Sequence, residues 1–190
     1  LDGASPELIG RLELQGVTAW SLEPTLTQLL TIRGSRLVQQ RLDDLASPGR
    51  VIGTHDGAYD VYAWTWRDRA VTWDHPDGGA SELRLWDLPA ARIERIVSSP
   101  VVPEQIDLDP GGSFLAAGAA RLFLFDLAAP ATAEPVPLLF EDALLGLHFS
   151  PDGSWLASVH NGTVMLWSMA GPRPIVLGRR EQGYWGSVAF

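Results

Sequence analysis

Histidine side chains are the most versatile acid–base and metal-binding groups available to this sequence, which contains four of them. They are His55, His75, His148 and His160. No two of them have the His-x-x-x-His spacing that brings two imidazoles together around a metal ion. The sequence therefore predicts surface or hydrogen-bonded turn histidines, with no metal site and no cofactor.

Pairs of acidic residues could supply the two carboxylates that general acid–base catalysis uses. The pairs are Asp107 with Asp109, Asp74 with Asp77, and Glu141 with Asp142. Asp109 and Asp152 occupy equivalent turns, where an Asp side chain accepts backbone hydrogen bonds, so we interpret these carboxylates as turn residues. Residues 74–80 also lack the ordered Asp-x-Asp-x-Asp-Gly pattern of a calcium loop.

Other catalytic motifs are missing from the sequence. It contains no Gly-x-Ser-x-Gly nucleophile elbow and no Gly-x-Gly-x-x-Gly dinucleotide motif. The sequence contains arginines but no lysine, which excludes a phosphate-loop lysine and a Schiff-base lysine. The exclusive use of arginine as the basic residue indicates a GC-rich bacterial coding sequence. Because the catalytic motifs are missing, the sequence predicts that the chain is not an enzyme.

The composition bounds the partners and the compartment. A net charge of −9 and a pI of about 4.8 argue against a nucleic-acid partner, because binding to phosphates requires a basic surface. No run of about 18 apolar residues could span a membrane, and residues 1–10 lack the features of a signal peptide. Since the sequence has no cysteine, it fits a reducing compartment, and a cytoplasmic location is expected.

Residues 144–177 form the clearest structural unit and predict a four-stranded antiparallel sheet. The first strand ends at the turn sequence Ser150-Pro151-Asp152-Gly153. Asn161-Gly162 then favours a two-residue hairpin, because both central residues of that turn require positive φ. The expected strands are Leu144–Phe149, Trp155–Val159, Thr163–Trp167 and Ile175–Leu177.

The unit recurs along the chain. One series, at intervals of 41 residues, is Leu108, Phe149 and Phe190, at the ends of apolar strands. Another series, at intervals of 39 and 42 residues in the expected third strands, is Trp86, Phe125 and Trp167. The set of repeat positions is completed by Asp87 after Trp86, by Asp126 at the end of the next third strand, and by the turn residues Asp152 and Gly153. A period near 40 residues with four strands per repeat is typical of a β-propeller blade.

The repeats resemble those of the WD-repeat β-propeller family. The resemblance lies in Phe149-Ser150-Pro151-Asp152-Gly153, Leu156-Ala157-Ser158, Asn161-Gly162-Thr163-Val164 and Leu85-Trp86-Asp87, with weaker copies at Asp109-Pro110-Gly111-Gly112 and Phe125-Asp126. It covers about Tyr59 to Phe190 well and the first third of the chain loosely. The resemblance implies a non-catalytic scaffold that binds other proteins.

The sequence departs from this family at several positions. Family blades often carry a Gly-His pair before the first strand, which completes a buried His–Asp–Ser–Trp hydrogen-bond network. Gly178-Arg179 stands in that place here, and Ser168 replaces the Asp that would follow Trp167. Asn161 stands where the family often has Asp. We therefore expect an absent or incomplete network and blades that depend more on packing.

The repeats divide the chain into blades. The expected units are 1–14 as the outer strand of a preceding blade, 17–53, 57–97, 104–139 and 144–178 as blades, and 186–190 as the first strand of a further blade. Trp20 and Trp64 are expected in inner-strand core positions, with Trp20 in the place of Phe149. Helices across residues 26–30 or 37–45 are the alternative for the first blade, but Arg33-Gly34-Ser35 interrupts them and favours strands.

We therefore predict an all-β propeller segment of about four blades, each a four-stranded antiparallel sheet, forming an open arc of a larger propeller. Further blades would be needed to close the ring, and unpaired strand edges would favour association. The alternative is a four-bladed ring closed by Ile9–Leu14 or Ser187–Phe190.

Aromatic residues near loops could anchor a partner, because one large ring buries much area at little cost in entropy. The candidate partner-binding rim is Trp73, Asp74, His75, Tyr184 and Trp185. The partners implied are other proteins or other domains of the same polypeptide, with the segment as the sensing or regulatory part of a larger protein. The alternative is a propeller accessory to a peptidase or kinase domain outside this chain. Sugar binding is disfavoured, since no polar and aromatic set repeats at one blade position.

Overall fold

The residues described by a computed structural model are 16–22, 27–54, 62–66, 68–74, 81–138, 142–171 and 174–179. Within these ranges every regular element is a β-strand, which confirms the all-β prediction. The helical alternative for the first blade is wrong, since Gln28–Arg33 and Arg36–Arg41 pair as an antiparallel hairpin. Gly34 in its turn has a φ of +57°, which glycine adopts without steric cost.

The described strands form four sheets, blades 1 to 4, each with four antiparallel strands in sequence order. Blade 1 comprises β1 (Val17–Leu22), β2 (Gln28–Arg33), β3 (Arg36–Arg41) and β4 (Arg50–Thr54). Blade 2 comprises β5 (Tyr62–Trp66), β6 (Arg69–Asp74), β7 (Ser81–Asp87) and β8 (Arg92–Ser99). Blade 3 comprises β9 (Gln105–Leu108), β10 (Phe114–Gly118), β11 (Leu122–Asp126) and β12 (Val136–Leu138). Blade 4 comprises β13 (Leu144–Phe149), β14 (Trp155–His160), β15 (Thr163–Ser168) and β16 (Pro174–Arg179).

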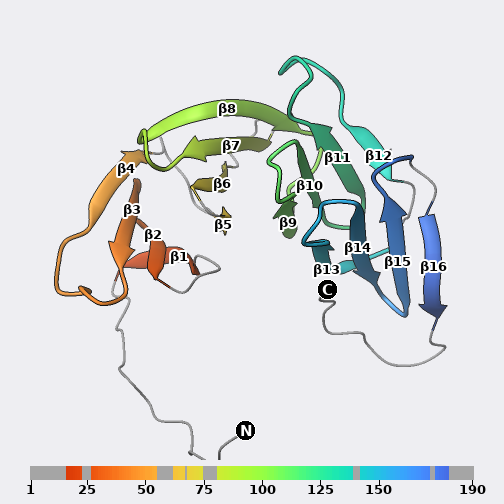
Figure 1. The fold of residues 1–190 in the computed structure, drawn as a ribbon, viewed down its shortest axis with the longest axis horizontal. Coiled ribbons are helices and arrows are strands. Elements are labelled where there is room, and N and C mark those ends of the chain that lie inside the picture. Colours follow the sequence, from red (N-terminus) through yellow and green to blue (C-terminus); the bar gives the residue numbers. More distant parts are fainter. Residues whose placement is uncertain are drawn as a thin grey trace, which may run out of the picture.

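The four blades follow one another along an open, propeller-like arc (Figure 1). The first strands β1, β5, β9 and β13 lie on the concave side, which we call the hub. The fourth strands lie on the convex side, which we call the outer side. Neighbouring first strands are in contact, β1 with β5, β5 with β9 and β9 with β13. The described chain therefore has the blade order and the open arrangement that the repeat predicts.

The strand register explains why aromatic residues recur in the third strands. Trp86, Phe125 and Trp167 each pair with the second residue of the neighbouring second strand. Their exposed fractions are 2%, 4% and 3%, so all three rings are buried. The position is thus a core position of the blade, as the sequence indicates.

The inner strands show the same equivalence. Leu108 pairs with Leu115, and Phe149 pairs with Leu156, in matching rows of blades 3 and 4. This register confirms that Leu108 and Phe149 are equivalent and face the same way. Phe190, the third predicted member of the series, lies outside the described residues.

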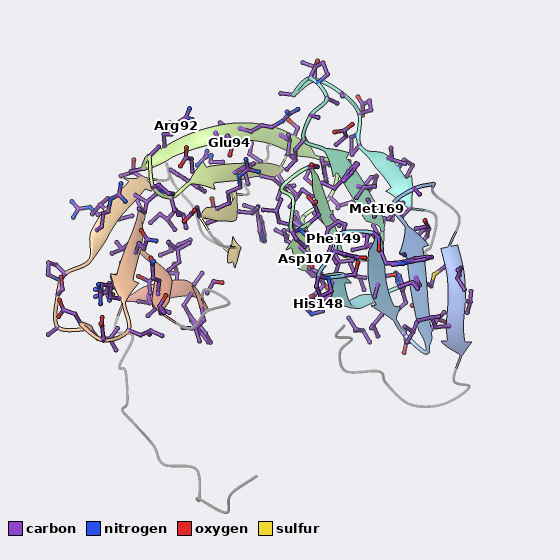
Figure 2. All side chains as sticks on the ribbon, in the orientation of Figure 1. Arg92, Glu94, Asp107, His148, Phe149 and Met169 are labelled. Atoms are coloured by element: carbon purple, nitrogen blue, oxygen red, sulfur yellow. The ribbon has the colours of Figure 1, made fainter. Side chains whose placement is uncertain are left out.

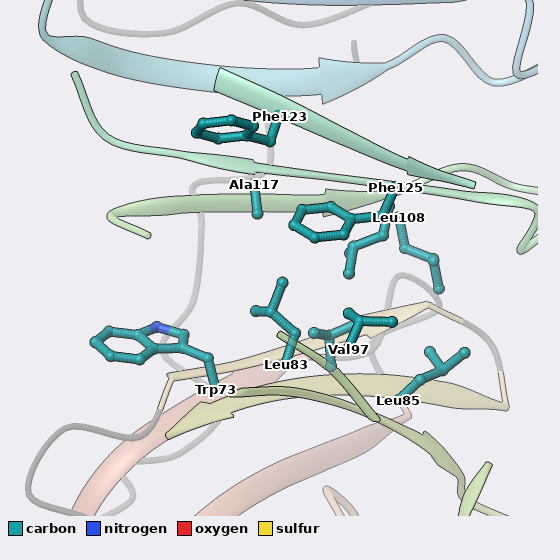
Figure 3. Packing of buried hydrophobic residues seen from close by; sticks show 10 residues of the cluster. Trp73, Leu83, Leu85, Val97, Leu108, Ala117, Phe123 and Phe125 are labelled. Atoms are coloured by element: carbon teal, nitrogen blue, oxygen red, sulfur yellow. The ribbon is translucent and has the colours of Figure 1, made fainter. Parts of the chain in front are cut away.

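Apolar side chains on facing sheets hold successive blades together. Each blade has a leading face, which packs on the preceding blade, and a trailing face, which packs on the following one. Figure 3 shows the cluster between blades 2 and 3, with Trp73, Leu83, Leu85 and Val97 opposite Leu108, Ala117, Phe123 and Phe125. Similar clusters join blades 1 and 2 around Trp86 and blades 3 and 4 around Trp167. Burial of these apolar side chains away from water stabilises the packing of each blade against the next.

The first strands of blades 1 and 2 depart from the predicted alignment. The register places Leu22, and not Trp20, in the position that Phe149 holds in blade 4. The Trp20 side chain is 57% exposed, so its prediction as a core residue is wrong. In blade 2 the backbone register likewise places Thr65 in this position and shifts Trp64 by one residue.

A buried polar network lies within blade 4. Trp167 Nε1 donates a hydrogen bond to Ser158 Oγ at 2.9 Å, and His160 Nε2 lies 3.0 Å from the same oxygen. In blade 2, Trp86 Nε1 donates to Thr72 Oγ1 at 2.8 Å. The network expected to be absent or incomplete is therefore present in part. In blade 4 its histidine comes from the second strand instead of a Gly-His pair before the first.

Candidate functional site

An arginine side chain links blades 2 and 3 on the outer side. Arg95 in β8 pairs with Leu85 in β7, which places it on the trailing face of blade 2. Its guanidinium donates hydrogen bonds to the backbone carbonyl oxygens of Leu127 and Ala129 in blade 3. Because the donor is charged, these bonds are stronger than neutral ones and tie the two blades together.

A second arginine strengthens the same interface. Arg69 Nη1 donates to the carbonyl oxygen of Gly112 at 3.0 Å, and Arg69 Nη2 lies 3.1 Å from the Glu94 carboxylate. Gly112 has a φ of +69°, and a Cβ atom there would collide with the Arg69 guanidinium. The turn therefore requires glycine both for its backbone conformation and for the approach of the arginine.

The link made by Arg95 recurs between blades 1 and 2. Arg50 in β4 pairs with Gln39, and Arg95 in β8 pairs with Leu85. The two pairs occupy equivalent positions in their blades. Arg50 Nη2 donates to the carbonyl oxygen of Pro89 in blade 2 at 2.7 Å. Two successive interfaces thus use an arginine from the fourth strand to bind carbonyl groups of the next blade.

The interface between blades 3 and 4 differs at the same place. Val136 pairs with Leu124 and so holds the position of Arg95, while Phe114 holds the position of Arg69. A cleft of about 190 Å³ opens there, which we call the outer cleft. Its lining includes Phe114, Leu124, Val136, Leu138, Trp167 and Met169. The outer cleft is therefore lined mainly by apolar side chains, although the chain as a whole is acidic.

Acidic residues of blade 3 are neighbours of lining residues of the outer cleft. Asp126 pairs with Phe114 of the lining, and it is exposed. Glu134 is also exposed and precedes the lining residue Val136 by two positions in the sequence. The part of blade 3 that lines the cleft is therefore flanked by acidic residues.

Blade 4 adds a further negative charge. The backbone N–H of Met169 donates to Ser154 O at 3.0 Å, which places the turn containing Asp152 beside the cleft. Hydrogen bonds from Ser150 and Ser154 lower the pKa of Asp152 to about 2. Asp152 is therefore ionised throughout the physiological range.

A different arrangement joins blades 3 and 4 at the hub (Figure 2). Asp107 in β9 is 4% exposed, and its Oδ2 accepts a hydrogen bond from Phe149 N in β13 at 2.6 Å. Its Oδ1 accepts a second bond from Leu108 N at 2.9 Å. His148 Nδ1 lies 3.8 Å from Oδ2 of the same carboxylate. A buried acidic group thus connects the first strands of two blades.

The protonation of this pair follows from its burial. Burial raises the pKa of Asp107 to about 7, although the two backbone N–H groups act in the opposite direction. Burial also lowers the pKa of His148. An ion pair would move both pKa values the other way, so we do not interpret the contact as an ion pair; with a pKa of about 7, Asp107 is about half protonated near pH 7. The site can hold a proton at neutral pH.

The structure describes two of the five residues predicted for the partner-binding rim. Trp73 is 3% exposed and packs between blades 2 and 3, so its indole is not available to a partner, which corrects that prediction. Asp74 is the last residue of β6 and pairs with Glu82. The remaining residues, His75, Tyr184 and Trp185, lie outside the described ranges.

The acidic repeat positions act in turns. Asp87 Oδ1 accepts a hydrogen bond from Ala90 N at 3.1 Å, and Asp126 Oδ1 accepts one from Ala128 N at 2.8 Å. Asp152 accepts from Ser154 N at 3.0 Å, next to Gly153 with a φ of +71°. The carboxylates therefore stabilise turn backbone, which the sequence predicts for Asp152 and which the structure adds for Asp87 and Asp126. Sequence reasoning missed the outer cleft and the buried Asp107, which only the strand register reveals.

A polar cleft of about 500 Å³ on blade 1 is the other concave site we considered. The Gln40 amide donates to Ser47 O at 2.6 Å, and Arg33 Nη2 donates to Gln40 Oε1 at 2.7 Å. Arg41 in its lining pairs with Asp43. Because the polar groups that line the blade 1 cleft already bind one another, the outer cleft is the stronger candidate for a partner-binding site.

The sequence matches no protein-family model and no curated protein. Within the described ranges, no helix is long and apolar enough to cross a membrane. The same ranges contain no group of three or more metal-binding side chains placed to hold an ion. The functional argument therefore rests on the geometry of the blades and of the outer cleft.

Proposed function

We propose that this chain is a non-catalytic, WD-repeat-like scaffold that binds other proteins, or other domains of its own polypeptide, in the cytoplasm. The observation that carries the proposal is the outer cleft between blades 3 and 4. An apolar cleft bordered by charge suits an anchoring side chain of a protein partner, since buried anchors contribute most of the free energy of binding. The cleft is built on hydrogen-bonded strands that pack in a common apolar core, and a site formed before binding limits the entropy lost on binding.

The edge strand of blade 4 supports the same function. Ile175, Val176 and Leu177 in β16 are 49%, 46% and 58% exposed. Three consecutive exposed apolar residues on an outermost strand favour contact with another polypeptide, because their burial is stabilising. The strand begins directly after the loop that borders the outer cleft, so one partner could cover both features.

Site-specific photo-crosslinking tests the proposal. A photoreactive phenylalanine analogue at Val136, which is 48% exposed, would report on the outer cleft. The same analogue at Ile93, 37% exposed on the fourth strand of blade 2, is the matched control. We expect a protein crosslinked from Val136 and not from Ile93 in cells that produce the chain.

Purified components then decide whether the crosslink reports a function. We expect the identified protein to bind the purified chain and Val136→Arg, which would fill the cleft, to weaken its affinity about tenfold or more, which corresponds to about 1.4 kcal/mol. Equal crosslinking from both positions, or an affinity unchanged by Val136→Arg, would contradict the proposal.

A further inference from the structure

The repeat identifies what occupies the place of the outer cleft at other blade interfaces. Between blades 2 and 3 the place is filled by the Arg95 side chain, which reaches the carbonyl groups of the next blade. Arg50 does the same between blades 1 and 2. Val136 is too short to reach across, so the space remains open between blades 3 and 4.

The carbonyl groups that would receive such an arginine have counterparts in blade 4. Leu127 N donates to Ser113 O, and Met169 N donates to Ser154 O, in matching turns of blades 3 and 4. Met169 and Gly171 are therefore the counterparts of Leu127 and Ala129, whose carbonyl oxygens bind Arg95. Among the described residues, no donor forms a hydrogen bond with the carbonyl oxygen of Met169 or Gly171.

The charge around the outer cleft matches the same occupant. Asp126 pairs with the lining residue Phe114, Glu134 precedes the lining residue Val136 by two positions, and both are exposed. On blade 4, the turn that contains Asp152 is tied to the lining residue Met169 through Ser154 O. An arginine would place its aliphatic part along Leu124 and Met169 and its guanidinium among acceptors and carboxylates. A purely apolar side chain would leave these acceptors without a donor, and a carboxylate would be repelled.

We propose that the outer cleft binds an arginine side chain presented by a partner protein. The partner would supply in trans the link that Arg50 and Arg95 supply within the chain at the other interfaces. This inference rests on the proposed scaffold function, because it names the chemistry of the partner that the same cleft receives.

Methionine NMR provides a direct test, because the sequence contains two methionines. Met169 lines the cleft, and Met165, 4% exposed in the core of blade 4, is the internal control. The probe is N-acetylarginine amide, and its neutral isostere N-acetylcitrulline amide is the matched control. We expect a saturable shift of the Met169 methyl with a Kd of about 1–10 mM for arginine, and at least about fivefold weaker binding for citrulline.

Two variants define the site. Val136→Arg supplies the arginine from within the chain and should abolish the response to the probe, whereas Val136→Gln, which is polar but uncharged and shorter, should retain it. No saturable Met169 shift up to about 50 mM probe would overturn the inference, as would equal shifts with citrulline. Arg173→Ala tests the chain's own arginine that follows the lining residue Gly171 by two positions in the sequence. If only that variant binds the probe, the cleft belongs to Arg173 and the inference is wrong.

The two proposals fail in different ways. A protein partner crosslinked at Val136 together with no arginine response would retain the scaffold function and overturn the arginine inference. An arginine response with no protein crosslinked at Val136 would retain the chemistry of the cleft and overturn the scaffold function.

Discussion

The interface between blades 2 and 3 and the interface between blades 3 and 4 share a core but differ on the outer side. Both bury an aromatic residue of the third strand, Phe125 in one and Trp167 in the other. On the outer side the first is closed by Arg69 and Arg95, whereas the second has Phe114 and Val136 and opens into a cleft. The comparison indicates that burial of apolar side chains stacks the blades, while two positions outside the core distinguish the closed interface from the one with an open cleft.

The largest effect should come from the shared core. Trp167→Ala and Phe125→Ala should each lower the free energy of unfolding by about 3–5 kcal/mol, because each leaves a cavity between two blades. Trp20→Ala, at a position that is 57% exposed, should cost about 1 kcal/mol or less. Urea unfolding measures all three variants. A much smaller cost for Trp167→Ala than for Phe125→Ala would show that the open interface is also loosely packed.

The polar partner of Trp167 should give the next largest effect. Ser158→Ala removes the hydroxyl that binds both Trp167 Nε1 and His160 Nε2, and it should cost about 2–3 kcal/mol because the buried indole N–H and the buried imidazole nitrogen each lose a hydrogen-bond partner. Ser154→Ala, in an exposed turn, is the control and should cost about 0.5 kcal/mol. Equal costs in urea unfolding would indicate that the network does not stabilise blade 4.

The hub carboxylate should make stability depend on pH. Because burial raises the pKa of Asp107 to about 7, the folded chain holds this proton between about pH 4 and pH 7 while the unfolded chain releases it. Its contribution to stability therefore falls as pH rises through this window. Asp107→Asn keeps an oxygen to accept from Phe149 N but does not titrate.

We therefore expect the stability of Asp107→Asn relative to the natural chain to rise by about 1–3 kcal/mol between pH 5 and pH 8. Asp109 and His148 are the other titratable groups near this carboxylate, so His148→Gln is included to remove the histidine's own titration. A difference between the chains that stays constant over this range would mean that Asp107 titrates normally.

The smallest effect should come from the outer arginine. Arg95→Met keeps much of the aliphatic length but removes the donors to Leu127 O and Ala129 O, which should cost about 1–2 kcal/mol. Val136→Met, at the equivalent position, should change stability by about 0.5 kcal/mol or less. Thermal unfolding of the two variants measures the difference. Equal effects would remove the distinction between a closed and an open interface.

The fold class was accessible from the sequence because the repeat combines spacing with turn chemistry. The interval between Leu108 and Phe149 and the Asn161-Gly162 turn are enough to predict the register of blades 3 and 4. In blade 1 the sequence prediction aligned Trp20 with Phe149 because both are aromatic. Counting residues from the turn at Gly34 instead aligns Leu22 with Phe149. A tight turn fixes register more reliably than a large side chain does.

The candidate site was less accessible. Val136 follows a connection of nine residues after β11, so its equivalence to Arg95 becomes visible only from its pairing with Leu124. Asp107 is adjacent in sequence to apolar residues, and no local pattern distinguishes a buried carboxylate from a turn residue. Both features depend on contacts between blades, which a single-strand pattern does not encode.

The most direct measurement of the central claim is the thermal midpoint of an arginine exchange between the two interfaces. If the two outer positions are equivalent, Arg95→Val should lower Tm by about 3–6 °C and Val136→Arg should raise it by about 2–4 °C. The double variant should fall near the sum of these shifts, since the two sites lie in different interfaces. If Val136→Arg fails to raise Tm in either background, the outer cleft does not have the geometry of the Arg95 site and the comparison is wrong.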